Sequence, residues 1–244
     1  MITLKSSITA RIRWIRSSGR RVAPRLVLFD LDDTLCDYTT ARWTRLRIAL
    51  GTALEASHID KPNIDTVVGE SIAIHPHASD HFPELLQRYG VLDAGLHAEA
   101  RRWYHQNRFY GLNLFPDALD VLRSVRAHPT ITAIGLVTNG PSDVQHDKIA
   151  LLKLRCEVDF AIISGDVGWE KPHPGIFDAA LAAGGSPPHQ TVFVGDSEEC
   201  DMVGAMNAGL TPIWINRTGR PWPLSAPPPT HTINNLSAVL ELLD

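Results

Sequence analysis

A short apolar run leads directly into closely spaced carboxylates in LVLFDLDDTL, residues Leu26 to Leu35. Its apolar part, Leu26 to Phe29, is typical of a strand that is buried on both faces of a parallel sheet. Side chains two positions apart in an extended chain point to the same side, so Asp30 and Asp32 are predicted to face one ligand. Because two carboxylates at such close range repel each other, the pair needs a proton or a bound cation.

Similar apolar runs recur along the chain and are separated by segments long enough for a helix. This alternation predicts an α/β fold with a Rossmann-like parallel sheet as its core. The later strands are expected at residues 131–137, 160–163, 191–194, 212–215 and 231–233. Apolar residues at helical spacing predict helices at 117–127, 142–154, 174–183 and 236–243.

The gap between the first two expected strands is far longer than one crossover helix requires. It contains three segments of helical periodicity, at residues 39–57, 82–89 and 96–110. We therefore predict an inserted helical cap domain. The predicted division is a basic N-terminal extension at 1–25, the α/β core at 26–36 and 116–244, and the cap at 37–115. Ligands of open α/β sheets bind beyond the carboxyl ends of the strands, so a cap that leaves from such an end is expected to overhang the site.

The composition of the 244 residues indicates a globular protein with small-molecule partners. Hydrophobic residues make up 44% and the formal net charge is -4. This charge gives no general attraction to nucleic acid polymers or anionic lipid, and no apolar run is long enough to span a membrane. The three cysteines form neither a zinc-binding pattern nor a disulfide framework. We expect a cytoplasmic monomer or homodimer.

The first 25 residues are the compositional exception, because they contain basic residues and no acidic one. The basic residues are Lys5, Arg11, Arg13, Arg16, Arg20, Arg21 and Arg25. Three interpretations stay open: a transit peptide, a disordered basic extension, or a start codon assigned too early.

Two later segments supply candidate phosphate ligands. The second expected strand runs into Thr138, Asn139 and Gly140, which place a hydroxyl and backbone N–H groups at the start of a helix, where an anion is favoured. Taken alone, this pattern is more often an ordinary polar cap at a strand-to-helix turn. Lys171, held next to Pro172, can neutralise a carboxylate or phosphoryl oxygens, although a solvated surface lysine is the ordinary explanation.

A fourth segment supplies further carboxylates. Asp196 follows the strand expected to end at Val194, and Asp201 lies a turn further on. Hard oxygen ligands of this kind suit Mg²⁺, which keeps several waters and a substrate phosphate in its shell. Together with Asp30 and Asp32 the arrangement suits phosphoryl transfer, in which one carboxylate attacks phosphorus while the other handles protons.

These four segments, in this order, resemble the haloacid dehalogenase superfamily over residues 26–244. The resemblance implies that Asp30 is the nucleophile that forms an aspartyl-phosphate and that Asp32 is the general acid and base. It also implies that Thr138 and Lys171 hold the phosphoryl group during catalysis. A carboxylate at position 32 favours phosphate esters as substrates, since halide and phosphonate chemistry does not use an acid there.

The same resemblance implies Mg²⁺ as the cofactor. Its ligands would be the carboxylates of Asp30 and Asp196 and the backbone carbonyl of Asp32, with Asp201 in a supporting role. Asn139 would join Thr138 and Lys171 in binding the substrate.

Further core residues resemble one branch of the superfamily, which holds N-acylneuraminate phosphatases and pyrimidine nucleotide monophosphatases. They are Thr138 to Gly140, Gln145, Lys148, Ile149, Lys171 to Phe177, Gly195, Asp196, Ala208, Gly209 and Trp214 to Asn216. The predicted function is Mg²⁺-dependent hydrolysis of a small phosphomonoester, either a sugar phosphate or a nucleoside monophosphate. Two alternatives stay open: a phosphomutase on the same scaffold, and a binding or regulatory protein without turnover.

Overall fold

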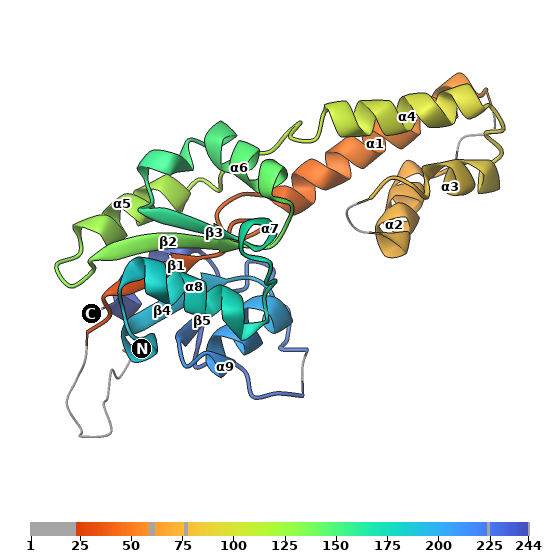
Figure 1. Cartoon of the computed structure of the whole chain (residues 1–244). Coiled ribbons are helices and arrows are strands. Elements are labelled where there is room, and N and C mark those ends of the chain that lie inside the picture. The colour runs from red at the N-terminus through yellow and green to blue at the C-terminus, as the bar shows by residue number, and fades with distance from the viewer. Residues whose placement is uncertain (1–22, 59–61, 76–77, 224, 244) are drawn as a thin grey trace, which may run out of the picture. The chain divides into compact units, whose positions relative to one another are not determined.

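The computed structural model describes residues 23–58, 62–75, 78–223 and 225–243. The chain divides into two compact units (Figure 1). The inserted unit is Asp37–Asn113, and the core unit consists of the chain up to Cys36 and from Leu114 onward. Most of the predicted basic extension, residues 1–22, lies outside the described residues. Among the described helices, none is long and apolar enough to cross a membrane.

One parallel sheet forms the centre of the core unit. Within the described residues it has six strands in the order β3-β2-β1-β4-β5-β6. The strands are β1 (Leu26–Phe29), β2 (Ala133–Thr138), β3 (Phe160–Ile163), β4 (Thr191–Gly195), β5 (Thr211–Ile215) and β6 (His231–Ile233). The predicted Rossmann-like α/β fold is confirmed. β2 begins later than predicted because the Ile131 amide donates to the His128 carbonyl and closes a turn.

The carboxyl ends of β1, β2 and β4 meet at one edge of the sheet. Phe29 at the end of β1 pairs with Leu136 of β2 on one side and with Val194 of β4 on the other. The chain passes from β1 outward to β2 and β3 and then returns to β4 on the opposite side of β1. The order of strands therefore reverses at β1, and such a switch point is where open α/β sheets bind ligands.

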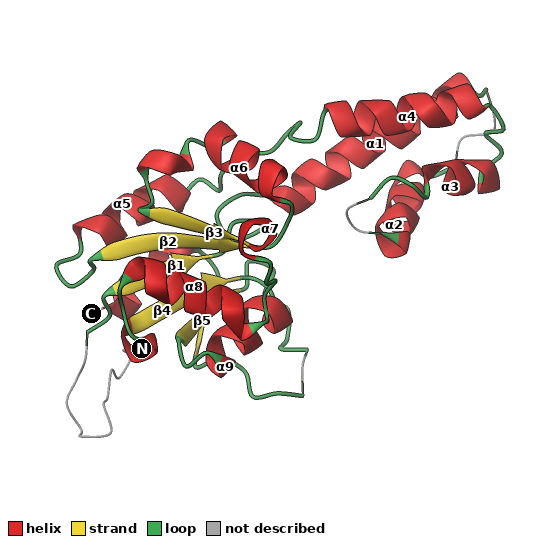
Figure 2. Ribbon diagram, viewed as in Figure 1, coloured by secondary structure: helices red, strands yellow, loops and turns green. Residues whose placement is uncertain are grey.

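Helices cover both faces of the sheet (Figure 2). They are α5 (Ala118–Ala127), α6 (Ser142–Leu151), α7 (Ser164–Val167), α8 (Pro174–Gly184), α9 (Gly204–Asn207) and α10 (Val239–Leu243). A π-helical segment, Glu198–Val203, precedes α9. Helix α6 ends earlier than predicted because Lys153 adopts a left-handed conformation, with φ 56°, before a 3-10 turn. The segment predicted as one helix at 236–243 is a 3-10 turn, Leu236–Ala238, followed by α10.

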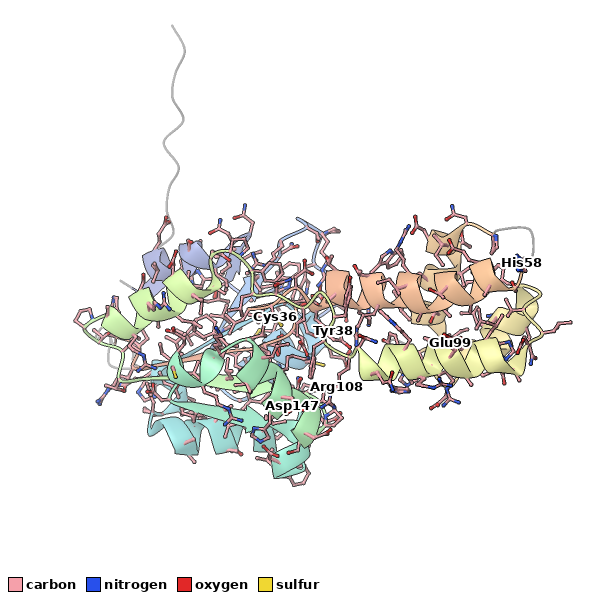
Figure 3. All side chains as sticks on the ribbon, turned by 90° about the horizontal axis from the view of Figure 1, so that it is seen from above. Cys36, Tyr38, His58, Glu99, Arg108 and Asp147 are labelled. Atoms are coloured by element: carbon pink, nitrogen blue, oxygen red, sulfur yellow. The ribbon has the colours of Figure 1, made fainter. Side chains whose placement is uncertain are left out.

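The inserted unit is built from helices. Its described part contains α1 (Tyr38–Ala56), α2 (Ile64–Ile74), α3 (Phe82–Arg88) and α4 (Ala94–Gln106). Helix α1 begins after Asp37, whose carboxylate accepts the Thr40 amide at 3.0 Å, and it lies beside α4. Tyr38 and Arg108 mark one end of this helical pair and His58 marks the other (Figure 3). The role of this unit as a cap over the site stays a prediction.

Candidate active site

Asp30 lies immediately after β1, at the switch point of the sheet. Its backbone amide donates to the Val194 carbonyl of β4 at 2.9 Å, which fixes its position relative to both strands. The side chain is buried, and Lys171 Nζ donates to its Oδ1 at 2.5 Å. The same ammonium donates to Asp201 Oδ1 at 2.7 Å. Lys171 therefore joins the end of β1 to the π-helical segment after β4.

Asp196 follows β4 and completes a cluster of carboxylates. One carboxylate oxygen each from Asp30, Asp196 and Asp201 lie within 4.8 Å of one another. Burial, together with the neighbouring charges of Asp30 and Asp201, raises the pKa of Asp196 to about 9. Burial also raises the pKa of Asp30 to about 7, although Lys171 opposes this shift. The cluster is thus costly to ionise without a further positive charge.

The donor set of this cluster fits a divalent cation. The ammonium of Lys171 pairs with Asp30 and Asp201, and Asp196 adds a third carboxylate, so full ionisation leaves an excess of negative charge. Burial lowers the pKa of Lys171, but Asp201 and Asp30 outweigh that effect and raise it above the ordinary lysine value. The ammonium therefore stays charged, and the remaining excess can be offset by a metal ion with hard oxygen ligands such as Mg²⁺.

The loop that carries Asp196 is held by its backbone. The Trp214 indole N–H donates to the Asp196 carbonyl at 2.9 Å, and Arg220 Nη2 donates to the same oxygen at 3.2 Å. Gly195 has no side chain because a Cβ at that position would collide with the carboxylate of Asp201. These contacts direct the Asp196 side chain toward the cluster without using its carboxylate.

Asp32 lies two residues beyond Asp30 and faces the helix α6. Lys148 Nζ donates to both of its carboxylate oxygens, at 2.7 and 2.6 Å, and Gln145 Nε2 lies 3.3 Å from Oδ2. The Asp32 side chain remains 26% exposed, whereas that of Lys148 is only 3% exposed. The Asp32 carboxylate is therefore bound by buried side chains of α6 and is still partly exposed to solvent.

Thr138 and Asn139 connect the end of β2 to the other site residues. Thr138 Oγ1 accepts from Gln145 Nε2 at 2.6 Å. The Asn139 side chain donates to the Lys171 carbonyl at 2.9 Å and accepts the Lys171 amide at 2.8 Å. Asn139 thus holds the backbone of the lysine loop, and its predicted direct contact with substrate stays a prediction. The Lys171–Pro172 peptide bond is cis.

Cys36 lies beside this site, and its thiol is held in the unreactive protonated form. Its Sγ is 3.4 Å from the Leu31 carbonyl and 3.5 Å from Asp32 Oδ1. Burial, followed by the charge of Asp32, raises the pKa of its thiol far above the ordinary value, so the nucleophilic thiolate is disfavoured. Figure 3 labels Cys36 in the loop after β1 and Asp147 on α6, both in the core unit.

The predicted site residues come together at the carboxyl edge of the sheet through the contacts above. They are Asp30, Asp32, Thr138, Asn139, Lys171 and Asp196. Sequence reasoning missed three contacts: the direct ion pair of Asp201 with Lys171, and those of Gln145 and Lys148 with Asp32. The available signal for the last two was their spacing, since residues three apart share one helix face.

The chain matches the haloacid dehalogenase-like hydrolase family over residues 24–209 and belongs to it. It is 37% identical over 129 residues to pyrimidine 5'-nucleotidase YjjG of Escherichia coli, a match covering 52% of this chain and 56% of that protein. It is 30% identical to N-acylneuraminate-9-phosphatase of Mus musculus, with 89% of this chain and 92% of that protein covered. The predicted superfamily and branch are confirmed.

A solved structure has the same fold. The HAD-hydrolase YfnB from Bacillus subtilis, bound to magnesium, superposes with a TM-score of 0.68 at 25% identity. The match covers 91% of this chain and 100% of that one. The magnesium belongs to that structure, and Asp30, Asp196 and Asp201 are the corresponding candidate ligands in this chain only by their own geometry.

Proposed function

We propose that this protein hydrolyses a small phosphomonoester by two successive phosphoryl transfers, with Mg²⁺ as cofactor. One observation carries the proposal. Asp30 is buried at the switch point with an ammonium against one carboxylate oxygen, and Asp32, a partly exposed carboxylate, lies two residues further on. A nucleophile and a proton carrier at this spacing are what phosphate ester cleavage requires.

In the first step Asp30 attacks the phosphorus of the ester. A bond forms between its carboxylate oxygen and phosphorus, and the bond from phosphorus to the ester oxygen breaks. Asp32 gives a proton to the departing alkoxide, which leaves as an alcohol. The phosphoryl group is then held on Asp30 as an acyl phosphate.

In the second step water attacks the same phosphorus. Asp32, now deprotonated, takes a proton from the water, and the bond between phosphorus and the Asp30 oxygen breaks. Inorganic phosphate leaves, and Asp32 has regained the proton that it needs for the next turnover. A single carboxyl group therefore serves as acid and base in turn.

Two groups are proposed to bind the phosphoryl oxygens, and three others are proposed to hold the cation. Lys171 supplies a buried positive charge, Thr138 supplies a hydroxyl, and Asp30, Asp196 and the backbone carbonyl of Asp32 are proposed to hold the cation. When bound, Mg²⁺ offsets charge on the phosphoryl oxygens and on the carboxylates. Asp201 supports the site by sharing the ammonium of Lys171 at 2.7 Å.

The proposed substrate is a sugar phosphate or a nucleoside monophosphate. By their names, the two relatives act on a pyrimidine nucleotide and on an N-acylneuraminate 9-phosphate. Both of these are small phosphomonoesters, so the core residues would handle the shared phosphate. We propose that the inserted unit acts as a cap that recognises the rest of the substrate.

The test is release of inorganic phosphate from p-nitrophenyl phosphate and from a panel of sugar phosphates and nucleoside monophosphates. Release should depend on added Mg²⁺ and stop with excess chelator. A phosphomutase would instead isomerise sugar phosphates with little phosphate release. A protein without turnover would give no product with any ester in either condition, and that result would overturn the proposal.

A further inference from the structure

Helix α6 presents two side chains to Asp32 that the proposed mechanism does not use. Gln145 and Lys148 lie three residues apart, so they share one face of the helix. Both are buried, and both donate to the Asp32 carboxylate. Asp32 is 116 positions from Lys148 in the sequence, so the fold alone brings them together.

The contact with Lys148 fixes the orientation of the Asp32 side chain. The ammonium lies 2.7 Å from Oδ1 and 2.6 Å from Oδ2, so rotation of the carboxylate would break at least one short contact. A buried ammonium is costly unless it is paired, which strengthens the restraint. A surface lysine would supply charge but would not impose this orientation.

Gln145 links this carboxylate to the group that is proposed to hold phosphate. Its Nε2 lies 2.6 Å from Thr138 Oγ1, 2.8 Å from the Asn139 carbonyl and 3.3 Å from Asp32 Oδ2. The neighbouring Gly140 has φ 142°, and a Cβ there would lie 3.1 Å from Gln145 Cγ. The turn after β2 is therefore shaped to leave room for this side chain.

We propose that Lys148 and Gln145 are positioning residues that hold Asp32 in the orientation for proton transfer, relative to the phosphoryl group bound at Thr138. This inference rests on the proposed function. Neither residue needs to touch the substrate. Lys148 acts through its contacts with both oxygens of Asp32, whereas Gln145 contacts both Asp32 and Thr138.

The two chemical steps give this proposal a specific kinetic signature. For an aryl ester such as p-nitrophenyl phosphate the leaving group departs without a proton, so kcat/KM does not depend on Asp32. Hydrolysis of the aspartyl-phosphate still needs Asp32 as the base, so kcat does. For an alkyl ester such as glycerol phosphate both parameters depend on Asp32.

The first experiment compares Lys148→Met with the wild-type protein on both esters. With p-nitrophenyl phosphate, kcat should fall about ten- to a hundredfold while kcat/KM stays within about threefold. With glycerol phosphate both should fall. Lys148→Arg should recover most of kcat, because a guanidinium can bind both carboxylate oxygens. The matched control is Lys153→Met, which removes an exposed lysine and should change neither parameter.

The second experiment is a double-mutant cycle with Asp32→Asn. If Lys148 acts through Asp32, Lys148→Met should cause no further loss of kcat in the Asp32→Asn background. The double variant also removes the carboxylate that Lys148→Met would leave unpaired. It therefore provides the comparison even if the single variant does not fold. A further tenfold loss in the double variant would overturn the proposal.

Gln145→Met provides a different signature. Because Gln145 also contacts Thr138, kcat/KM for p-nitrophenyl phosphate should fall along with kcat.

Equal loss of both parameters on both esters in Lys148→Met would mean general distortion and would contradict the positioning role. If the wild-type protein releases no phosphate from any ester, the proposed function fails and this inference fails with it. Turnover by wild type with an unaffected Lys148→Met would refute the inference alone.

Discussion

The candidate site of the core unit differs from the inserted unit in how deeply its ion pairs are buried. In the core unit the side chains of Lys148 and Lys171 are each 3% exposed and bind carboxylates directly. In the inserted unit an ion pair such as Arg88 with Glu70 is 57% and 40% exposed, with its atoms 3.4 Å apart. Surface pairs contribute little to stability, whereas breaking a buried pair is costly. The buried lysine pairs therefore lie at the candidate site, while the inserted unit is packed around a cluster of apolar side chains.

The largest effect should come from Asp30→Asn. The amide has nearly the same shape as the carboxylate but cannot form an acyl phosphate, so phosphate release should fall by at least about a thousandfold. Steady-state assays with Mg²⁺ measure this, and thermal unfolding checks the fold. Asp178→Asn, an exposed position on α8, is the matched control and should retain full activity. Comparable loss in both variants would contradict the role of Asp30.

Lys171→Met should affect stability as well as activity. It removes the ammonium from Asp30 and Asp201 and leaves two buried carboxylates without that partner. Breaking such a pair should lower the free energy of unfolding by about 3–5 kcal/mol. Urea denaturation measures the change, with Lys153→Met as the control. A variant as stable as wild type would show that the buried pairs do not support the core.

The inserted unit should respond to loss of apolar volume instead. Leu50 of α1 is fully buried, so Leu50→Ala should lower the free energy of unfolding by about 2–5 kcal/mol. Leu92, which is 81% exposed in the same unit, provides the control, and Leu92→Ala should cost less than about 0.5 kcal/mol. Similar losses of unfolding free energy in Leu50→Ala and Leu92→Ala would contradict the view that apolar packing stabilises the inserted unit.

The smallest effect is the pH dependence of Mg²⁺ binding to the core unit. Burial raises the pKa of Asp196 to about 9 and that of Asp30 to about 7, so protons compete with the cation below these values. Because these pKa values are raised in the folded protein, the protonated carboxyl groups stabilise the metal-free fold at low pH. This stabilisation is lost as the pH rises toward about 9. Mg²⁺ affinity, measured by calorimetry, should therefore increase by up to about tenfold per pH unit over this range. Constant affinity would contradict the assignment of these ligands.

Much of the core could be predicted because buried parallel strands leave continuous apolar runs in the sequence. Leu26 to Phe29 was placed with its observed bounds, and Asp30 follows it directly. The start of β2 and the end of α6 were misplaced because local hydrogen bonds at His128 and a left-handed Lys153 set them. Helix α2 was not predicted, since its β-branched residues and Gly69 have low helix propensity and packing stabilises the helix instead.

The candidate site could be predicted only in part for a related reason. Motifs next to strand ends identified Asp30, Asp32 and Lys171, because a parallel sheet gathers its carboxyl ends at one edge. The contacts of Gln145 and Lys148 with Asp32 depend on how α6 packs over the sheet, and Asp32 is more than a hundred positions away from both. Spacing within the helix indicates a shared face but does not show what that face contacts.

The central claim is that Asp30 becomes covalently phosphorylated, and acid quenching tests it most directly. Wild-type protein mixed with a ³²P-labelled substrate and Mg²⁺ should retain label on the peptide that contains Asp30. The label should disappear after treatment with hydroxylamine, which cleaves acyl phosphates, and should be absent from Asp30→Asn. Rapid phosphate release without any protein-bound label, or label on another residue, would contradict the mechanism.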